Sequence, residues 1–111
     1  MKKIGRLVVT KGLAKSFRIP IRADGVIPSG FASMEFRGGV QKPDGKFTTL
    51  AITTTELEGV ITVTISETIS DTLTAIIPSV VVLLYKHTTA GQAFELGYFD
   101  VLVADRGFAW S

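Results

Sequence analysis

The chain contains no cysteine, one histidine and one tryptophan. Without cysteine it can form no disulfide bond, no thiolate metal site and no cysteine nucleophile. A zinc site needs three or four His, Cys or carboxylate ligands, and one histidine among scattered acids is a poor basis for such a site. The composition therefore disfavours disulfide scaffolds and thiolate metalloproteins, and it leaves the redox compartment open.

Long hydrophobic runs are absent as well. The most apolar stretch, 76–85, has ten residues and is interrupted by Pro78, whereas a membrane-spanning helix needs about 20. The basic opening of the chain is broken by Gly5 and Arg6 before an apolar core can form, so we do not expect a secretion signal. The sequence predicts no membrane partner.

Motifs for catalysis are also missing. His87 is expected to be an exposed residue at the start of a hairpin loop. No serine lies in a G-x-S-x-G turn, and no glycines form a phosphate-binding loop of the G-x-x-x-x-G-K-[ST] type. The acidic residues are scattered, so a pair for sugar hydrolysis could arise only through the fold. The sequence predicts no enzyme, no cofactor, no metal and no small-molecule substrate.

What the chain does have is enough apolar material for one core. Its 111 residues are 46% hydrophobic and 20% charged. A domain of this size buries roughly two-thirds of the surface that its unfolded chain exposes. We therefore take 1–111 as a single domain, with 1–14 as a basic N-terminal arm or edge strand and 105–111 as a tail.

Apolar and polar residues alternate with a period of two through most of the chain, as in half-buried strands. Pro20 lacks a backbone donor, so the strand 16–22 should lie at a sheet edge or carry a bulge. The other segments with strand character are 4–10, 31–37, 47–53, 60–65, 80–85 and 94–103. We expect one row of the core to consist of Phe17, Ile19, Ile21, Ile61, Val63 and Ile65.

Turn residues separate these segments. Gly38-Gly39 with 43–46 predict one hairpin, and 88–91 predict the loop of another. The only helix candidate is 66–76, which Ser66 can cap and which should span one or two turns at most. Seven or eight short strands favour an all-β fold, an immunoglobulin-like β-sandwich of antiparallel strands, over a barrel.

The segment 80–85 is apolar on both faces. A small sandwich has no layer to cover an outer face, which leaves that face available to a partner. The alternative is a monomer in which the short helix or the tail covers it. We predict a protein that associates with itself or with another protein, and the candidate contact residues are Val80, Val82, Leu84 and Trp110.

Charge is distributed unevenly. Residues 1–22 carry seven basic side chains and no acidic one, and the remainder carries five basic and ten acidic, for a net charge of +2. Basic residues on an edge strand ordinarily prevent strand-to-strand aggregation. The other interpretations are docking on a neighbouring protein, pairing with the chain's own acidic part and, least favoured, binding nucleic acid. The candidate contact residues of this segment are Lys2, Lys3, Arg6 and Lys11.

A larger pattern covers residues 15–104. In order, it contains Arg18-Ile19-Pro20-Ile21, a strand with Phe31 and Met34, the 43–46 hairpin, the run 58–66, Asp71-Thr72, a long apolar strand and the run 95–101. This order resembles the N-terminal β-sandwich module of tailed-phage upper-baseplate proteins. The resemblance implies a scaffold and transfers no binding residue. The chain departs from that family in stopping at residue 111, where family members continue, and in the apolar run 80–85.

We therefore predict a bacteriophage virion structural protein, a baseplate or tail component, that is located in the virion and contacts itself or another virion protein, as a homo-oligomer. A capsid decoration protein is the alternative within this class. A module that binds carbohydrate or a host surface is the alternative outside it. Such a binder should gather exposed aromatic residues on one face, for which Tyr85, Tyr98 and Trp110 are the candidates.

Overall fold

The computed structural model describes residues 2–88 and 91–104. Its elements are β1 (Lys3–Thr10), β2 (Lys15–Pro20), η1 (Phe31–Ser33), β3 (Met34–Gln41), β4 (Phe47–Thr55), η2 (Glu56–Glu58), β5 (Val60–Ile65), α1 (Glu67–Asp71), β6 (Ser79–His87) and β7 (Ala93–Ala104). The predicted all-β class is confirmed. No helix in these ranges is long and apolar enough to cross a membrane.

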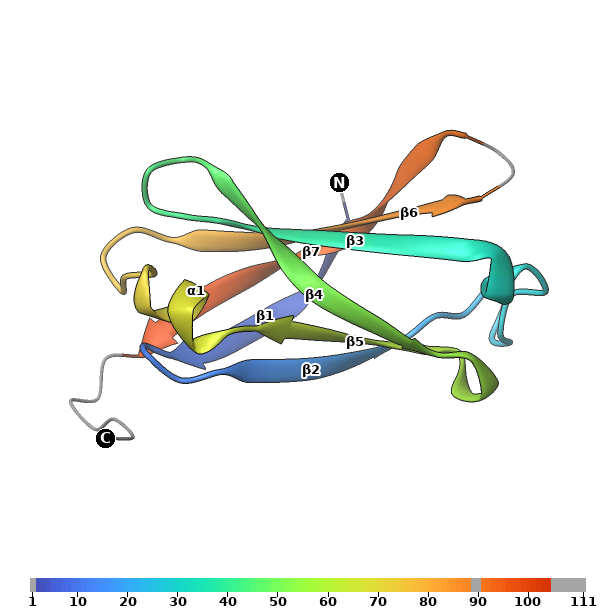
Figure 1. Ribbon diagram of the computed structural model, residues 1–111, viewed down its shortest axis with the longest axis horizontal. Helices are drawn as coiled ribbons and strands as arrows, with labels where there is room; N and C mark the ends of the chain where they lie inside the picture. Colours follow the sequence, from blue (N-terminus) through green and yellow to red (C-terminus); the bar gives the residue numbers. More distant parts are fainter. Residues whose placement is uncertain (1, 89–90, 105–111) are drawn as a thin grey trace.

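The strands form one sheet in the order β1-β7-β6-β3-β4-β5-β2, which curls until it is nearly closed as a barrel (Figure 1). The immunoglobulin-like sandwich is not confirmed, because a single sheet connects all seven strands. Strand β4 makes this connection. Its residues up to Leu50 pair with β3, and those from Ala51 onward pair with β5. Alternation could not distinguish the two architectures, since both bury one face of each strand.

One pairing differs from the antiparallel prediction. Strands β1 and β7 run parallel, with Leu7 opposite Val101 and Val9 opposite Val103. Antiparallel neighbours can be joined by a short hairpin. Here the two strands are the first and last that the described residues form, so no hairpin sets their direction.

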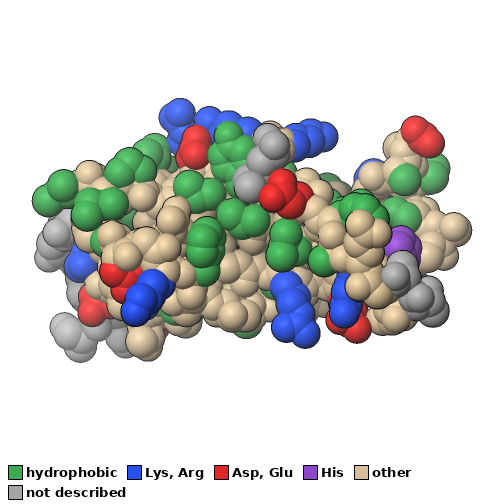
Figure 2. Space-filling model, turned by 90° about the horizontal axis from the view of Figure 1, so that it is seen from above, with side chains coloured by type: hydrophobic (Ala, Val, Ile, Leu, Met, Phe, Trp, Pro, Cys, Tyr) green, Lys and Arg blue, Asp and Glu red, His purple; other side chains and the backbone are tan. Residues whose placement is uncertain are grey.

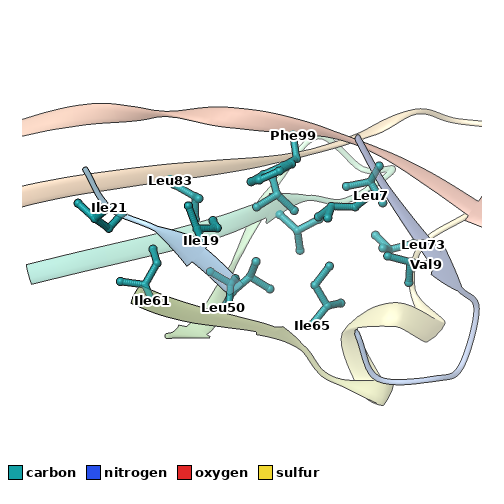
Figure 3. Packing of buried hydrophobic residues seen from close by; sticks show 14 of the residues in the cluster. Leu7, Val9, Ile19, Ile21, Leu50, Ile61, Ile65, Leu73, Leu83 and Phe99 are labelled. Atoms are coloured by element: carbon teal, nitrogen blue, oxygen red, sulfur yellow. The ribbon is translucent and has the colours of Figure 1, made fainter. Parts of the chain in front are cut away.

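Apolar side chains on the inner face fill the barrel (Figure 3). In β5, Ile61, Val63 and Ile65 are all fully buried. Phe17 of β2 lies opposite Val63, and Ile19 lies opposite Ile61. The predicted core row is thus confirmed, including its phase. β2 is also an edge strand, as Pro20 predicted.

Two strand boundaries were wrong. Residues Phe31–Ser33 form a 3₁₀ turn instead of the start of a strand, because the preceding Pro-Ser-Gly turn leads Phe31 N to donate to Pro28 O. Gly38 and Gly39 lie inside β3 and not in a turn. The predicted hairpin itself is present at 43–46, where Gly45 has φ +86° and Asp44 Oδ1 accepts from Lys46 N at 2.9 Å.

Helix α1 is shorter than the predicted 66–76 but begins where expected. Ser66 Oγ accepts from Ile69 N at 3.2 Å, which is the predicted cap. One turn later, Ser70 is fully buried against the connection between β1 and β2. Its hydroxyl donates to Thr10 O at 2.9 Å and accepts from Gly12 N at 3.0 Å. We call this pair of bonds the Ser70 clasp.

Beside the clasp, Lys11 secures the last turn of the helix. Its ammonium donates to the carbonyl oxygens of Asp71 at 2.9 Å and Leu73 at 3.0 Å. A cation near a helix C-terminus satisfies carbonyl groups that have no partner within the helix. The end of the barrel where β1 turns into β2 is therefore closed by α1.

Between the two edge strands the sheet does not pair with itself. β1 and β2 converge at their connecting turn and part toward the other end of the barrel (Figure 1). Phe99 of β7 lies across Gly5 of β1, where an added Cβ would stand 3.3 Å from its ring. The same ring meets Phe17 of β2 edge-on, with centroids 5.2 Å apart. We call this open line between β1 and β2 the seam, and these two rings cover it from inside.

Replacing Ile61 by alanine should lower the free energy of unfolding by about 2–5 kcal/mol, because the buried side chain leaves a cavity. Ile76→Ala is the matched control, since Ile76 is 90% exposed and its truncation should change stability by about 0.5 kcal/mol or less. Urea denaturation measures both. Equal midpoints for the two variants would show that the strand phase is off by one residue.

Ser70→Ala should cost about 1–3 kcal/mol, because the part-buried Gly12 N–H loses its acceptor. Thr68→Ala provides the control. Thr68 is exposed on the same helix, so both changes bring a similar gain in helix propensity and only Ser70→Ala breaks the clasp. If chemical denaturation gives the two variants the same stability, the clasp does not close the barrel.

Candidate functional site

The outward face of β6 carries the apolar residues that the sequence predicted as contacts. Along this strand Ser79, Val81 and Leu83 are buried inside the barrel. Val80 and Val82 point outward and are half-buried, and Leu84 is 38% exposed. In the described residues, α1 packs at the barrel end against the turn after β1 and does not cover this face. Figure 2 looks down on the side of the molecule where β3 and β6 lie uppermost and shows hydrophobic side chains gathered there.

A hollow of about 410 Å³ lies in this face, beside Val82 and Leu84. Its floor is Gly39 of β3, which is opposite Val82 in the sheet, and one wall is Phe47 of β4, 57% exposed. An added Cβ on Gly39 would stand 3.4 Å from the Phe47 ring. We call this surface of β6, β3 and β4 the outer apolar face: Val80, Val82, Leu84, Gly39 and Phe47.

Phe47 and Gly39 were not predicted as part of the site. A glycine in a strand interior commonly marks a bulge or a close approach, and this signal was available in the sequence. The two adjacent glycines have different tasks. A Cβ on Gly38 would point into the barrel and stand 2.9 Å from Leu83 Cδ2 and 3.2 Å from Ile52 Cδ1. Gly38 therefore makes room for the core, and Gly39 leaves the outer hollow open.

The four basic candidates are divided among different places. Lys3 pairs with Asp100 at 2.7 Å, and Arg6 lies opposite Asp100 in the parallel register. Because Asp100 is also opposite Val80, these charges border the outer apolar face. Lys2 is exposed ahead of β1, and Lys11 is bound to α1 at the closed end. Trp110 lies outside the described residues.

Part of the N-terminal positive charge is matched by the chain's own acids. Besides Lys3 with Asp100, Arg18 pairs with Glu58, and both pairs are solvent-exposed. Such exposed pairs contribute little to stability, about 0–1 kcal/mol each. The sequence left several interpretations of the basic N-terminal segment open. The structure shows two of them, pairing with the acidic part of the chain and placement on edge strands.

The aromatic candidates for a carbohydrate-binding face do not lie together. Tyr98 is opposite Val82 and shares its outward side. Tyr85 lies an odd number of residues away from Val82 on β6, so it points to the other side, where it stacks on Phe94 with centroids 5.7 Å apart. The described residues thus present these two tyrosines on opposite sides of the sheet.

Groups that could carry chemistry are few. His87 ends β6, next to Gly30. Over residues 2–88 and 91–104, no three His, Asp or Glu side chains lie close enough to hold a metal ion. Comparison with known proteins adds no assignment, because no family model and no curated protein matches the chain.

The two neighbouring glycines of β3 give a matched test of the site geometry. Gly38→Ala should destabilise the protein by about 1–3 kcal/mol, because its Cβ is forced against packed core side chains. Gly39→Ala should leave stability unchanged or raise it by up to about 1 kcal/mol, because alanine suits a strand better than glycine does. Thermal unfolding compares the two. The reverse order would mean that the inside and outside of β3 are exchanged.

Proposed function

We propose that this protein is a non-catalytic structural protein of a bacteriophage virion, a baseplate or tail component that assembles through protein–protein contacts. The observation that carries the proposal is the outer apolar face. Its apolar side chains stand outward on β6 and β4 around an open hollow. Contiguous apolar surface of this kind is typical of interaction sites.

The surroundings of this face suit a protein partner. Arg37 lines the hollow. Three charged residues, Lys3, Arg6 and Asp100, border the outer apolar face on its β1–β7 side, next to Val80. Protein interfaces commonly have an apolar centre within a polar rim, with arginine enriched. A site for a small molecule is instead typically a deep pocket with converging polar groups. The hollow has mainly apolar and backbone surfaces, so a protein surface is the better match.

The virion assignment rests on the resemblance of residues 15–104 to the baseplate module. We retain the immunoglobulin-like sandwich within this proposal as the arrangement that the resemblance implies. The change of partner along β4 supports it, because the first part of this strand pairs with β3 and the second part with β5. A capsid decoration protein remains the second candidate, since its contacts would use the same surface.

A double substitution, Val82→Ser with Leu84→Ser, tests the contact surface. We expect it to reduce self-association about tenfold, since a contact would bury the part of both side chains that is still exposed, at about 25 cal/mol per Å² of apolar surface. Ile76→Ser is the control, because Ile76 is 90% exposed between α1 and β6. Sedimentation velocity over a dilution series gives the dissociation constants. A double variant that associates like the wild type would exclude the outer apolar face.

The virion assignment has a separate test. Mass spectrometry of purified phage particles from a host that carries this gene should detect the chain at a fixed ratio to the other structural proteins. Expression during infection without incorporation into particles would contradict the assignment.

A further inference from the structure

The seam opens into a groove at the end of the barrel opposite α1. Its volume is about 320 Å³, and it lies between the beginning of β1 and the end of β2. The lining combines apolar walls with a basic rim and includes no acidic residue. The apolar residues are Ile4, Ile19, Pro20, Ile21 and Leu96, and the basic ones are Lys2, Lys3 and Arg22. We call this the seam groove.

The β1 wall of the groove is fixed by backbone packing. Tyr98 N donates to Lys2 O at 2.9 Å, which holds the chain just before β1 on β7. Gly97 has φ +152°, and an added Cβ would stand 2.5 Å from Ile4 Cγ1 and 2.7 Å from Lys2 O. Only glycine allows this close approach. The packing of Ile4 against Gly97 therefore forms within one chain and needs no second protein. The groove is therefore a feature of the folded chain by itself.

A projecting turn stands beside the groove. In η2, Leu57 is 94% exposed and lies between Glu56 and Glu58. Arg22 holds this turn next to the groove rim, because its guanidinium donates to Glu58 O at 3.2 Å and to Gly59 O at 3.0 Å. We call residues Glu56–Glu58 the η2 tip.

We propose that the η2 tip of one copy enters the seam groove of a second copy, and that the second copy does the same in return. Leu57 would meet the apolar walls, and Glu56 would meet the ammonium of Lys2 at the rim. Within the described chain, neither of these two charged side chains has an ion pair. Because tip and groove are neighbours on one end of the molecule, a two-fold axis can bring both pairs together, as in an isologous dimer.

The backbone of β2 explains why a projecting tip fits better than an added strand. Ile21 N donates to Gly59 O, so the backbone groups of the alternate residues Arg18 and Pro20 face the seam. Pro20 has no N–H, and an incoming strand would find no donor there. Docking at the groove must therefore depend on side chains, which the tip supplies with one apolar and one free acidic residue.

Substitutions in the tip and on the rim test this contact by sedimentation velocity. Leu57→Ser should raise the dimer dissociation constant about tenfold or more, and its exposure leaves the fold intact. Glu56→Lys and Lys2→Glu should each weaken the dimer. The double variant Glu56→Lys with Lys2→Glu should regain much of the loss, because the charges are exchanged across the contact.

Ile76→Ser is the matched control, since Ile76 is 90% exposed and follows α1, which lies at the opposite end of the molecule (Figure 1). The inference is overturned if Leu57→Ser and Ile76→Ser behave alike, if the double charge variant shows no recovery, or if the wild type is monomeric up to the solubility limit. Binding of a DNA oligonucleotide that Lys2→Glu abolishes would also overturn it, by assigning the groove to nucleic acid.

These outcomes are separate from those of the outer apolar face. Val82 and Leu84 lie on another surface, so their double variant should keep the tip-to-groove contact. Added salt also separates them. The contact of Glu56 with Lys2 should weaken as salt screens it, over about 10 Å at 0.1 M, whereas association through the outer apolar face should not weaken.

Discussion

The contact between Phe17 and Phe99 closes a sheet whose two edges do not pair. A curled sheet with free edges must cover its interior along the line where hydrogen bonding stops. Here one aromatic ring crosses a residue without a side chain, Gly5, and meets a ring from the opposite edge. The Ser70 clasp performs the corresponding task at the end of the barrel. Without these contacts the apolar inner face would be open to water.

This way of closing the barrel gives its two ends different properties. At one end the buried hydroxyl of Ser70 and the ammonium of Lys11 satisfy backbone groups and hold α1 in place. At the other end the edges separate, and basic residues border an apolar groove. The charge asymmetry of the sequence has its structural explanation here, because the basic residues of the first 22 positions lie on and around the two edge strands.

Much of the fold could be predicted because alternation reports which side of a strand is buried. The row containing Ile61 and Ile19 was correct in phase, and Pro20 correctly marked an edge. Alternation could not show that one sheet joins all the strands, because this depends on β4 changing partners at Leu50. The parallel pairing of β1 with β7 could not be predicted either, since it joins segments about 90 residues apart and follows from tertiary packing.

The candidate site was predictable in part for the same reason. A strand apolar on both faces pointed to Val82 and Leu84. The hollow beside them depends on Gly39, which we had placed in a turn because glycine pairs are frequent there. The sequence pattern did not single out Leu57, because its exposure depends on how Arg22 and Gly59 hold the η2 turn. Side-chain bonds to distant backbone groups leave no periodic pattern in a sequence.

We propose that the chain works by binding copies of itself through surfaces that residues 2–88 and 91–104 leave uncovered. Light scattering of the wild-type protein over a dilution series tests it most directly. We expect a mass above the 11.9 kDa of one chain at high concentration, falling toward that value on dilution. A mass of one chain at every concentration and salt level would contradict it.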